Sequence, residues 1–374
     1  MAQNSNQKSF LVIVSVLSVV ISLTYLISIL ARGYQPDFND GFKFKATGLL
    51  SATSKPKSAS VFINGQLYTA TDDTINLSPG KYQVKIIKDG YQPWSKNVEI
   101  QKEMVVQTEA TLFRSAPDFS PITQNGALNP TVNLDKNSLV FSVSEAGASK
   151  DNGIYLIETY SSPLPLGKNT PKQIIGNFPS IDWSNYSFTF SPNSKQILAI
   201  SHTQNTAYLL NLETSGLKKP TDVSNLITFI NNDWQKQRSQ ILLSKLERLP
   251  AKLRPLVATQ SADILFSEDD SKALYLSQKG PYLVYDLKKD INYPIGNLNE
   301  IDNPFWLPNS NNLVYSNKSQ QIKTVEYDGS NQSTIFAGKF SNNLILPWSD
   351  GSKIIVYTRP FPEAPENLYS VSIR

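Results

Sequence analysis

Acidic side chains are the residues of this chain whose type and spacing come closest to catalytic chemistry. Cleavage of a glycosidic bond requires only two carboxylates, about 5.5 Å apart or more. Asp182, Asp263, Glu300 and Asp302 lie near the starts of repeated strand segments, where loops could bring such a pair together. The run Glu268–Asp270 is better explained as a turn. Because no acidic motif marks these positions, we expect a protein that is not an enzyme, with a surface carbohydrate-active enzyme of the glycoside hydrolase type as the alternative.

The composition excludes several other chemistries. The chain has no cysteine, which removes disulfides, thiolate metal sites, iron–sulfur clusters and cysteine nucleophiles. His202 is the only histidine, so sites that need two histidines cannot form, and we interpret it as an ordinary surface or loop residue. The chain also lacks the G-x-S-x-G, P-loop and G-x-G-x-x-G motifs. We therefore expect no catalytic residue, no cofactor and no metal.

A basic segment at residues 226–258 contains the only convincing helical period outside the N-terminal region. It carries six basic and two acidic residues, so its net charge of +4 equals that of the whole chain. Its apolar residues recur at i, i+4, i+7 and i+11, and these are Leu242, Leu246, Leu249 and Leu253. Pro250 and Pro255 divide the segment, which predicts a helix to about Leu249 and a second short helix that starts at Pro250.

Two interpretations of this segment stay open. It is either a helical hairpin packed on the rim of the neighbouring domain with solvated cations, or a docking surface for an anionic partner. Lipid headgroups and an envelope polymer are the anionic partners that we consider. The candidate docking residues are Trp234, Lys245, Arg248, Lys252 and Arg254.

The whole chain has 374 residues, which is enough for two or three domains. Its net charge is only +4 with mixed signs throughout, which is not typical of a nucleic-acid-binding protein. We therefore expect no nucleic-acid partner.

An uncharged apolar run occupies residues 10–31, and its 22 residues exceed the roughly 20 that cross a bilayer as a helix. The apolar core of a cleaved signal peptide is shorter, at about 7–15 residues. The run predicts an uncleaved single-pass anchor, with residues 1–9 as a short cytoplasmic tail and 32–45 as a stalk. Basic residues occur on both sides of the run and do not set its orientation. We expect the amino terminus inside and the bulk of the chain outside the cell membrane, because a short tail followed by a long folded part is the usual layout of an exported signal anchor.

Residues 46–113 show short alternating runs that predict a small antiparallel β-sandwich. The runs are 48–54, 59–63, 81–87 and 96–100, and the turns between them contain Asn64-Gly65, Pro79-Gly80 and Asp89-Gly90. Three ordered blocks resemble the PEGA domain: Pro56-x-x-Ala59-x-Val61-x-Ile63-Asn64-Gly65, Leu77-x-Pro79-Gly80-x-Tyr82-x-Val84 and Lys88-x-Gly90-Tyr91. The resemblance implies a non-catalytic accessory module of a surface or envelope protein.

Residues 114–374 contain five copies of one pattern, in which a polar turn is followed by two short strands. Aligned on Leu139, Ile197, Ala273, Leu313 and Ile354, the copies are spaced by 58, 76, 40 and 41 residues. A unit of about 40 residues with four short strands is typical of a propeller blade. The phrase F/W-S-P-N/D-G/S-x-x-I-x-Y resembles the TolB-type, WD40-like propeller repeat. We interpret Trp183, Trp306 and Trp348, which precede the turns, as core residues rather than sugar-stacking platforms.

These observations predict an all-β protein: a transmembrane helix, a PEGA-like β-sandwich, and a five- or six-bladed β-propeller with a helical insertion at 226–258. Residues 114–130 are expected to supply a strand that closes the ring. The predicted function is binding or scaffolding at the cell envelope, where the propeller presents a face to a protein or polysaccharide.

Overall fold

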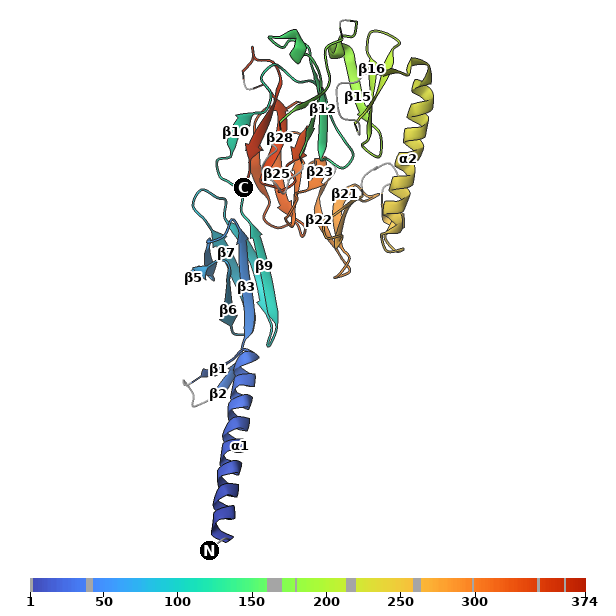
Figure 1. The fold of residues 1–374 in the computed structure, drawn as a ribbon. Helices are drawn as coiled ribbons and strands as arrows, with labels where there is room; N and C mark the ends of the chain where they lie inside the picture. Colours follow the sequence, from blue (N-terminus) through green and yellow to red (C-terminus); the bar gives the residue numbers. More distant parts are fainter. Residues whose placement is uncertain are drawn as a thin grey trace. The chain divides into compact units, whose positions relative to one another are not determined.

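In the computed structural model the chain folds into two compact units, residues 1–112 and 113–374 (Figure 1). The structure describes residues 3–37, 43–159, 170–178, 180–212, 220–257, 264–297, 299–341, 344–359 and 361–374. Strands dominate both units, and apart from the N-terminal helix they form many small sheets.

The first unit begins with helix α1, Gln3–Ala31. Its segment Phe10–Ala31 has a mean hydropathy of 2.7, and none of that stretch is buried against the rest of the chain. By length and composition this helix can cross a membrane, and a signal sequence near an N-terminus meets the same criteria. The helix ends at a left-handed glycine: Gly33 has φ +84°, and its amide donates to the carbonyl of Leu30 at 3.0 Å.

A two-stranded hairpin follows the helix. Strand β1, Tyr34–Asp37, pairs antiparallel with β2, Lys43–Ala46. The side chains of β2 alternate between exposed and half-buried, as the Lys-Phe-Lys-Ala order requires. The described part of the stretch that the sequence assigned to a stalk is therefore a regular hairpin.

Two sheets form the rest of the first unit. One has the order β6-β3-β9 and the other β5-β4-β7-β8. The strands are β3 Gly48–Lys55, β4 Ser60–Ile63, β5 Gln66–Ala70, β6 Asp73–Leu77, β7 Gly80–Ile87, β8 Trp94–Ile100 and β9 Val105–Thr111. The expectation of a purely antiparallel sandwich is wrong at one pair, because β9 runs parallel to β3. A parallel pair requires a long crossover, and the chain between these two strands forms β6 and the whole second sheet.

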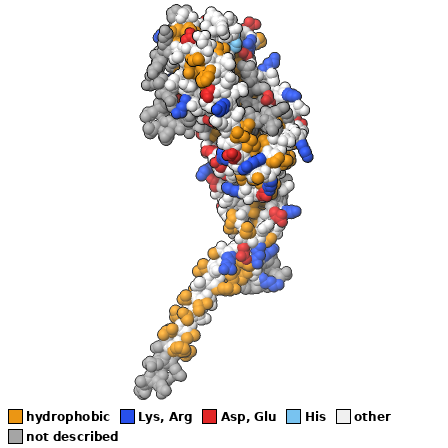
Figure 2. Space-filling model, turned by 90° about the vertical axis from the view of Figure 1, so that its right-hand side faces the viewer, with side chains coloured by type: hydrophobic (Ala, Val, Ile, Leu, Met, Phe, Trp, Pro, Cys, Tyr) orange, Lys and Arg blue, Asp and Glu red, His pale blue; other side chains and the backbone are white. Residues whose placement is uncertain are grey.

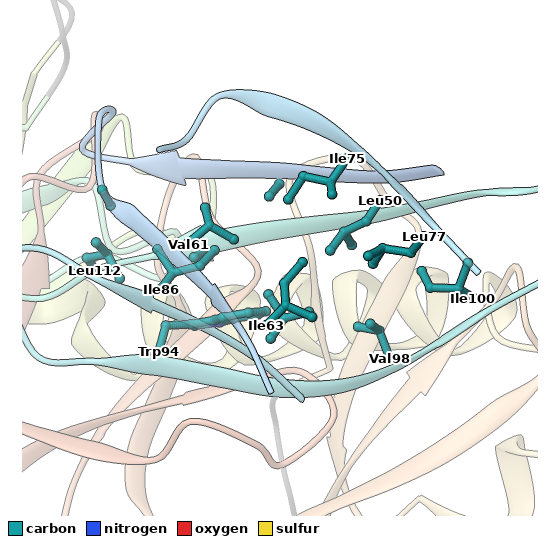
Figure 3. Packing of buried hydrophobic residues seen from close by; sticks show 14 residues of the cluster. Leu50, Val61, Ile63, Ile75, Leu77, Ile86, Trp94, Val98, Ile100 and Leu112 are labelled. Atoms are coloured by element: carbon teal, nitrogen blue, oxygen red, sulfur yellow. The ribbon is translucent and has the colours of Figure 1, made fainter. Parts of the chain in front are cut away.

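The core of this unit lies between its two sheets (Figure 3). In β7 the predicted alternation is confirmed: Val84 and Ile86 are buried, and Lys85 between them is exposed. The predicted hairpin turn is also present, since Asn64 and Gly65 both adopt positive φ angles between β4 and β5. Fourteen buried residues make up the cluster, including Leu50, Val61, Trp94, Ile100 and Leu112.

The described residues of the second unit form five four-stranded antiparallel sheets. Four sheets take consecutive strands, in the orders β11-β12-β13-β14, β15-β16-β17-β18, β19-β20-β21-β22 and β23-β24-β25-β26. Their first strands are Leu128–Val132, Tyr186–Phe190, Leu265–Phe266 and Asp302–Trp306, and their second strands are Ser138–Val143, Gln196–Ser201, Lys272–Leu276 and Asn312–Ser316. Their third strands are Gly153–Glu158, Ala207–Asn211, Pro281–Asp286 and Gln321–Glu326, and their fourth strands are Lys172–Ile175, Thr221–Asp222, Ile291–Asn297 and Ser333–Ala337.

The fifth sheet joins the two ends of this unit. Its order is β10-β29-β28-β27, with β10 Asp118–Pro121, β27 Ile345–Pro347, β28 Lys353–Thr358 and β29 Asn367–Ser372. Asp118 pairs with Ser372 and Pro121 with Tyr369, so the first strand of the unit completes the sheet formed by the last three. The strand expected from residues 114–130 is therefore present as β10.

The repeat alignment coincides with the sheets. Each aligned residue, from Leu139 to Ile354, is the second residue of its strand, which is the second strand in each of the first four sheets and β28, next to β27, in the fifth. All five are fully buried or nearly so. The repeated pattern in the sequence thus marks one strand position in every sheet.

Helix α2, Ile227–Glu247, lies between the second and third sheets in the chain and packs on both. Its first half packs on Leu198 and Ala207 of the second sheet, while Leu242 and Leu246 pack on Ala273 of the third. The predicted helix end at about Leu249 lies within two residues of the observed end. The predicted second helix at Pro250 is wrong: a turn follows, and only a 3-10 turn, Arg254–Leu256, is formed.

Candidate functional site

The repeated turns of the second unit enclose a cavity of about 490 Å³. Its wall comes from the turn between the first and second strands in four of the five sheets, together with the C-terminal end of α2. The lining residues that bear on its chemistry include Lys136, Lys245, Arg248, Phe266, Glu268 and Trp306.

A left-handed residue shapes each of these turns. Three positions before the aligned strand residue, Lys136, Ser194, Asp270 and Gly351 all have positive φ angles. In the remaining repeat, the left-handed residue is Asn309, one position earlier. Such a residue reverses the chain within a few positions, which brings side chains of successive repeats to the same end of their sheets.

Three cationic side chains line the cavity. The Arg248 guanidinium carbon lies 3.7 Å from the centroid of the Phe266 ring, and one guanidinium nitrogen lies 2.5 Å from an Asp270 carboxylate oxygen. The ammonium of Lys136 donates to the side chain of Asn303 and lies 5.2 Å from the Phe305 ring centroid. Both cations are therefore fixed in position, a condition for recognising an anion without a large loss of side-chain entropy.

Lys245, the third cation of the cavity, lies in the last turn of α2, three residues before the C-cap Arg248. Its side chain is half-buried. Two of the five predicted docking residues, Lys245 and Arg248, thus line the same cavity.

Trp306 supplies a half-buried aromatic wall. Its indole nitrogen donates to the carbonyl of Leu265 at 2.8 Å, which links the fourth sheet to the third and fixes the ring. A fixed aromatic ring beside cations can stack on the apolar face of a sugar while the cations pair with its acidic groups.

Two carboxylates, Asp135 and Glu268, also line the cavity, and both residues are exposed. A Glu268 oxygen accepts a hydrogen bond from the amide of Asn309 at 2.9 Å. Neither residue was among the carboxylates that the sequence pattern proposed as a pair, although Glu268 belonged to the run assigned to a turn.

The predicted acidic candidates lie elsewhere. Asp182 accepts hydrogen bonds from the amide and hydroxyl of Ser184 at the start of a 3-10 turn, which is an N-cap role. Glu300 and Asp302 precede or begin β23 and do not line this cavity. Asp263 lies outside the described residues.

The other predicted docking residues serve the fold. Trp234 is only 6% exposed and packs with Leu198 and Val223, so the expectation of a partner anchor is wrong at this position. Lys252 pairs with Asp290, at 2.5 Å. Arg254 donates to the carbonyls of Glu247 and Leu249, which satisfies acceptors at the end of α2.

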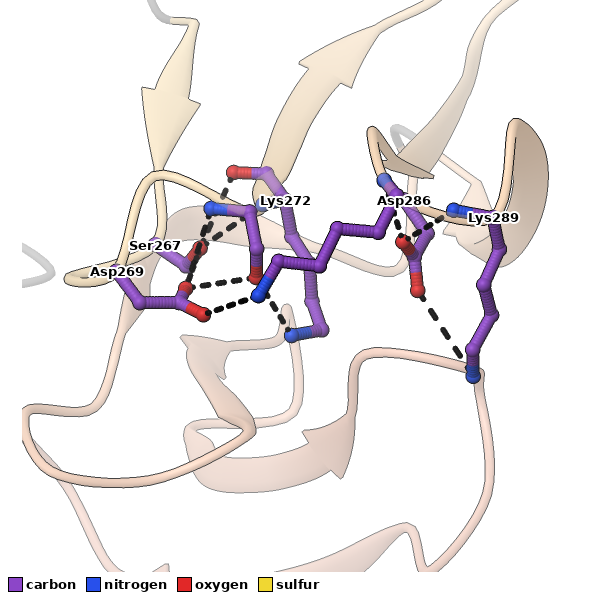
Figure 4. A network of polar contacts seen from close by, with 7 residues as sticks. Ser267, Asp269, Lys272, Asp286 and Lys289 are labelled. Carbon is purple, nitrogen blue, oxygen red and sulfur yellow. Dashed lines mark hydrogen bonds and ion pairs between the residues drawn. The ribbon is translucent and has the colours of Figure 1, made fainter.

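A polar network fixes the turn of the third sheet beside the cavity (Figure 4). Asp269 accepts hydrogen bonds from the hydroxyls of Ser267 at 2.8 Å and Ser271 at 2.7 Å. The pKa of the Asp269 carboxyl is strongly lowered, chiefly by the Ser271 hydroxyl, with further contributions from Ser267 and the nearby Lys272. This carboxylate stabilises the turn that carries Asp270, the partner of Arg248.

Lys136 and the cavity were not predicted from the sequence. The sequence does mark Lys136 as unusual, because a lysine stands there at the turn position that serine, aspartate or glycine occupies in other repeats. Among the described residues, no group of three or more His, Asp or Glu side chains is placed to hold a metal ion.

Comparison with known proteins identifies one domain. Residues 47–115 match the PEGA domain, so the resemblance expected from the three sequence blocks is confirmed. The chain therefore combines an N-terminal apolar helix, a PEGA domain of the surface type, and a second unit of small sheets.

No curated protein matches the chain. Among solved structures, an oligogalacturonate lyase in complex with manganese is similar, at 10% sequence identity. The match covers 83% of this chain and 81% of that chain, with a TM-score of 0.25.

Proposed function

We propose that this chain is a membrane-anchored, extracytoplasmic binding protein of the cell envelope, and that its second unit holds a segment of an anionic polysaccharide. The apolar helix supports the anchor, and the PEGA domain is of a kind found on surface and envelope proteins. In this proposal the helix stays uncleaved, with its amino terminus inside the cell.

We further propose that the five sheets are the blades of a five-bladed, TolB-like propeller. The proposal is supported by five antiparallel sheets of equal strand number and by the β10–β29 pairing, which joins the unit's first strand to its last sheet. In a propeller, the turns after the innermost strands meet at one end of the central axis. The cavity would then lie at that end, where propellers commonly bind ligands.

The cavity lining carries this functional proposal. Lys136, Lys245 and Arg248 outnumber the two carboxylates of the lining, Asp135 and Glu268, although Arg248 is itself paired with Asp270. Trp306 provides a fixed aromatic plane beside them. Acidic sugars present carboxylates or sulfates beside apolar ring faces, and this combination matches the lining. A neutral glycan would gain nothing from the positive charge of the lining.

The test measures binding of acidic and neutral polysaccharides of matched length to the full chain in detergent, by calorimetry. We expect binding of the acidic polymer only, and roughly tenfold weaker binding, about 1.4 kcal/mol, for Lys136→Gln and for Lys245→Gln. Lys236→Gln is the matched control, because Lys236 is an exposed lysine of the same helix that does not line the cavity. Equal affinity for both polymers, or an equal loss in the control, contradicts the proposal.

A glycoside-cleaving enzyme is the second candidate, and the presence of Asp135 and Glu268 in the cavity lining favours it. Against it, both residues are exposed, and Glu268 is hydrogen-bonded to the Asn309 amide. The same polymers incubated with the chain distinguish the two. Shortened products that disappear with Glu268→Gln establish the enzyme, whereas binding without cleavage supports the binding protein.

A further inference from the structure

One end of the first unit combines exposed apolar and cationic side chains next to the end of the apolar helix. We name it the juxtamembrane face and define it by Arg32, Lys43, Lys45, Lys102, Met104 and Val105. These residues come from three places: the helix exit, strand β2, and the loop between β8 and β9 with the first residue of β9.

Hydrogen bonds tie this face to the helix end. The amide and hydroxyl of Thr47 both donate to the carbonyl of Gly33, two residues after α1 ends. The amide of Glu103 donates to the carbonyl of Thr47 at 3.0 Å, and the Tyr34 hydroxyl donates to the Glu103 carboxylate at 2.7 Å. The loop at residues 101–104 is therefore fixed within a few residues of the helix, not separated from it by a free linker.

Two neighbouring apolar side chains on this face are exposed. Met104 and Val105 are each 55% exposed. Their backbone is held in place, because the Leu49 amide donates to the Met104 carbonyl at 2.9 Å and Val105 begins strand β9. An ordered pair of exposed apolar side chains beside a membrane-length helix is suited to the interfacial layer of a bilayer.

Cationic residues occur on the same elements as this apolar pair or on elements next to them in the chain. Arg32, Lys43 and Lys45 are exposed. The Lys102 ammonium lies 5.2 Å from the Tyr34 ring centroid and 3.6 Å from a Glu103 carboxylate oxygen. Figure 2 shows Lys and Arg side chains gathered where the apolar helix meets the rest of this unit. With Asp37, Asp40 and Glu103 counted from the sequence, residues 32–46 and 101–105 keep a net charge of +1. Lysine and arginine at this depth pair with lipid phosphates, while a tyrosine is favoured at the same level.

We propose that the juxtamembrane face binds the headgroup layer of an anionic phospholipid bilayer, with Met104 and Val105 in the interface and the four cations on lipid phosphates. The inference rests on the membrane anchor of the proposed function. It accounts for the three basic residues that follow the helix on the side assigned to the cell exterior. In this arrangement the PEGA domain contacts the membrane surface directly and is not connected to it by a flexible stalk.

The absence of cysteine from the chain makes a site-specific test direct. The full chain carrying Met104→Cys is labelled with a nitroxide and reconstituted in nanodiscs of phosphatidylcholine mixed with phosphatidylglycerol. Paramagnetic relaxation by oxygen, which concentrates in lipid, is compared with relaxation by a water-soluble nickel complex. The matched probe is Asp89→Cys, in the β7–β8 turn. Because Gly80 pairs with Ile100 beside the loop, Asp89 follows the opposite end of β7, whose eight residues span about 23 Å.

We expect the Met104 label to be shielded from nickel and accessible to oxygen, and the Asp89 label to show the reverse. Replacing Lys43, Lys45 and Lys102 by Gln should raise the nickel accessibility of the Met104 label towards that of Asp89, whereas replacement by Arg should preserve shielding. If the Arg variants lose the shielding of the Met104 label as the Gln variants do, positive charge at these three positions is not what holds the face on the lipid.

Two further outcomes separate this inference from the proposed function. If the discs retain the chain but both labels are equally accessible to nickel, the anchor stands and the lipid-binding face is refuted. If the chain elutes apart from the discs, the anchor fails and the inference fails with it. Shielding that appears only when a soluble anionic polymer is added to phosphatidylcholine discs overturns the lipid assignment in favour of an envelope polymer.

Discussion

Arg248 stacks on Phe266, with its guanidinium carbon 3.7 Å from the ring centroid, and the same side chain pairs with Asp270. The contact joins the residue that follows α2 to the first turn of the third sheet. It therefore makes the end of the insertion a wall of the cavity. A cation held in this way contributes both to the stability of the unit and to the charge that the cavity presents.

Replacement of Arg248 by Ala tests this dual role. The side chain is 46% exposed, so the stacking and the ion pair together are expected to contribute only about 1 kcal/mol to the free energy of unfolding. Urea denaturation of the full chain measures the loss. Lys236→Ala on the same helix should change the free energy by less than about 0.5 kcal/mol. Equal effects of the two variants would show that the Arg248 contacts are not stabilising.

Trp234→Ala is expected to be much more damaging. The indole is buried between α2 and the second sheet, and truncating a buried aromatic residue costs about 3–5 kcal/mol. Thermal and urea denaturation should show a destabilised second unit. Phe229→Ala is the control, since Phe229 is 71% exposed on the same helix. Unchanged stability in Trp234→Ala, combined with a loss of ligand binding, would return Trp234 to the role of a partner anchor.

Gly48→Ala is expected to destabilise the first unit by roughly 1–3 kcal/mol, in the range of overpacked cores. A Cβ atom at this position would overlap the Gln101 carbonyl oxygen and lie 2.7 Å from a methyl carbon of Ile100. Only glycine allows the loop at 101–104 to approach β3 this closely. Gly147→Ala, where a Cβ meets nothing within 4 Å, should be nearly neutral. Hydrogen exchange measures the effect of each change in its own unit, at the β3 and β9 amides for Gly48→Ala and at the β12 and β13 amides for Gly147→Ala.

The stability of the second unit should fall in acid through Asp269. The pKa of this carboxyl is lowered on folding, so its contribution is fully present above its ordinary pKa of about 3.8 and is lost as the pH falls below that value. Urea midpoints from pH 6 to pH 2.5 should decline less in Asp269→Asn than in the unmodified chain. Identical slopes for the Asn variant and the unmodified chain contradict the assignment.

The strands of the second unit could be located from the sequence because the same strand position is buried in every repeat. Leu139 and Ile197 are fully buried, so an apolar residue is required at each of these positions. The turn before each of them requires a residue in the left-handed conformation. These local requirements leave a visible period. The strand β10 was also anticipated, from the expectation that residues 114–130 add a strand to the last repeat.

The cavity and the parallel pairing of β9 were harder to predict from the sequence. Strand β9 pairs with β3 across more than fifty residues, and no local pattern distinguishes a parallel edge strand from an antiparallel one. The burial of Trp234 depends on which face of α2 meets the second sheet, whereas the leucines that reveal the helical period pack on the third. Lys136 is separated from Lys245 by more than a hundred residues, so their convergence is a property of the tertiary fold alone.

The pairing of β10 with β29 also sets the order in which the two units of the chain can finish folding. Asp118 emerges early in synthesis, yet its partner Ser372 is added about 250 residues later. During synthesis β10 has no partner strand until β29 has been made. The strands of the PEGA domain are all complete by Thr111, so this domain has no such delay. A ribosome that stops before β29, or a protease that removes this strand, would therefore leave a finished first unit attached to a second unit with an open sheet edge, and an open edge can pair with other chains and aggregate.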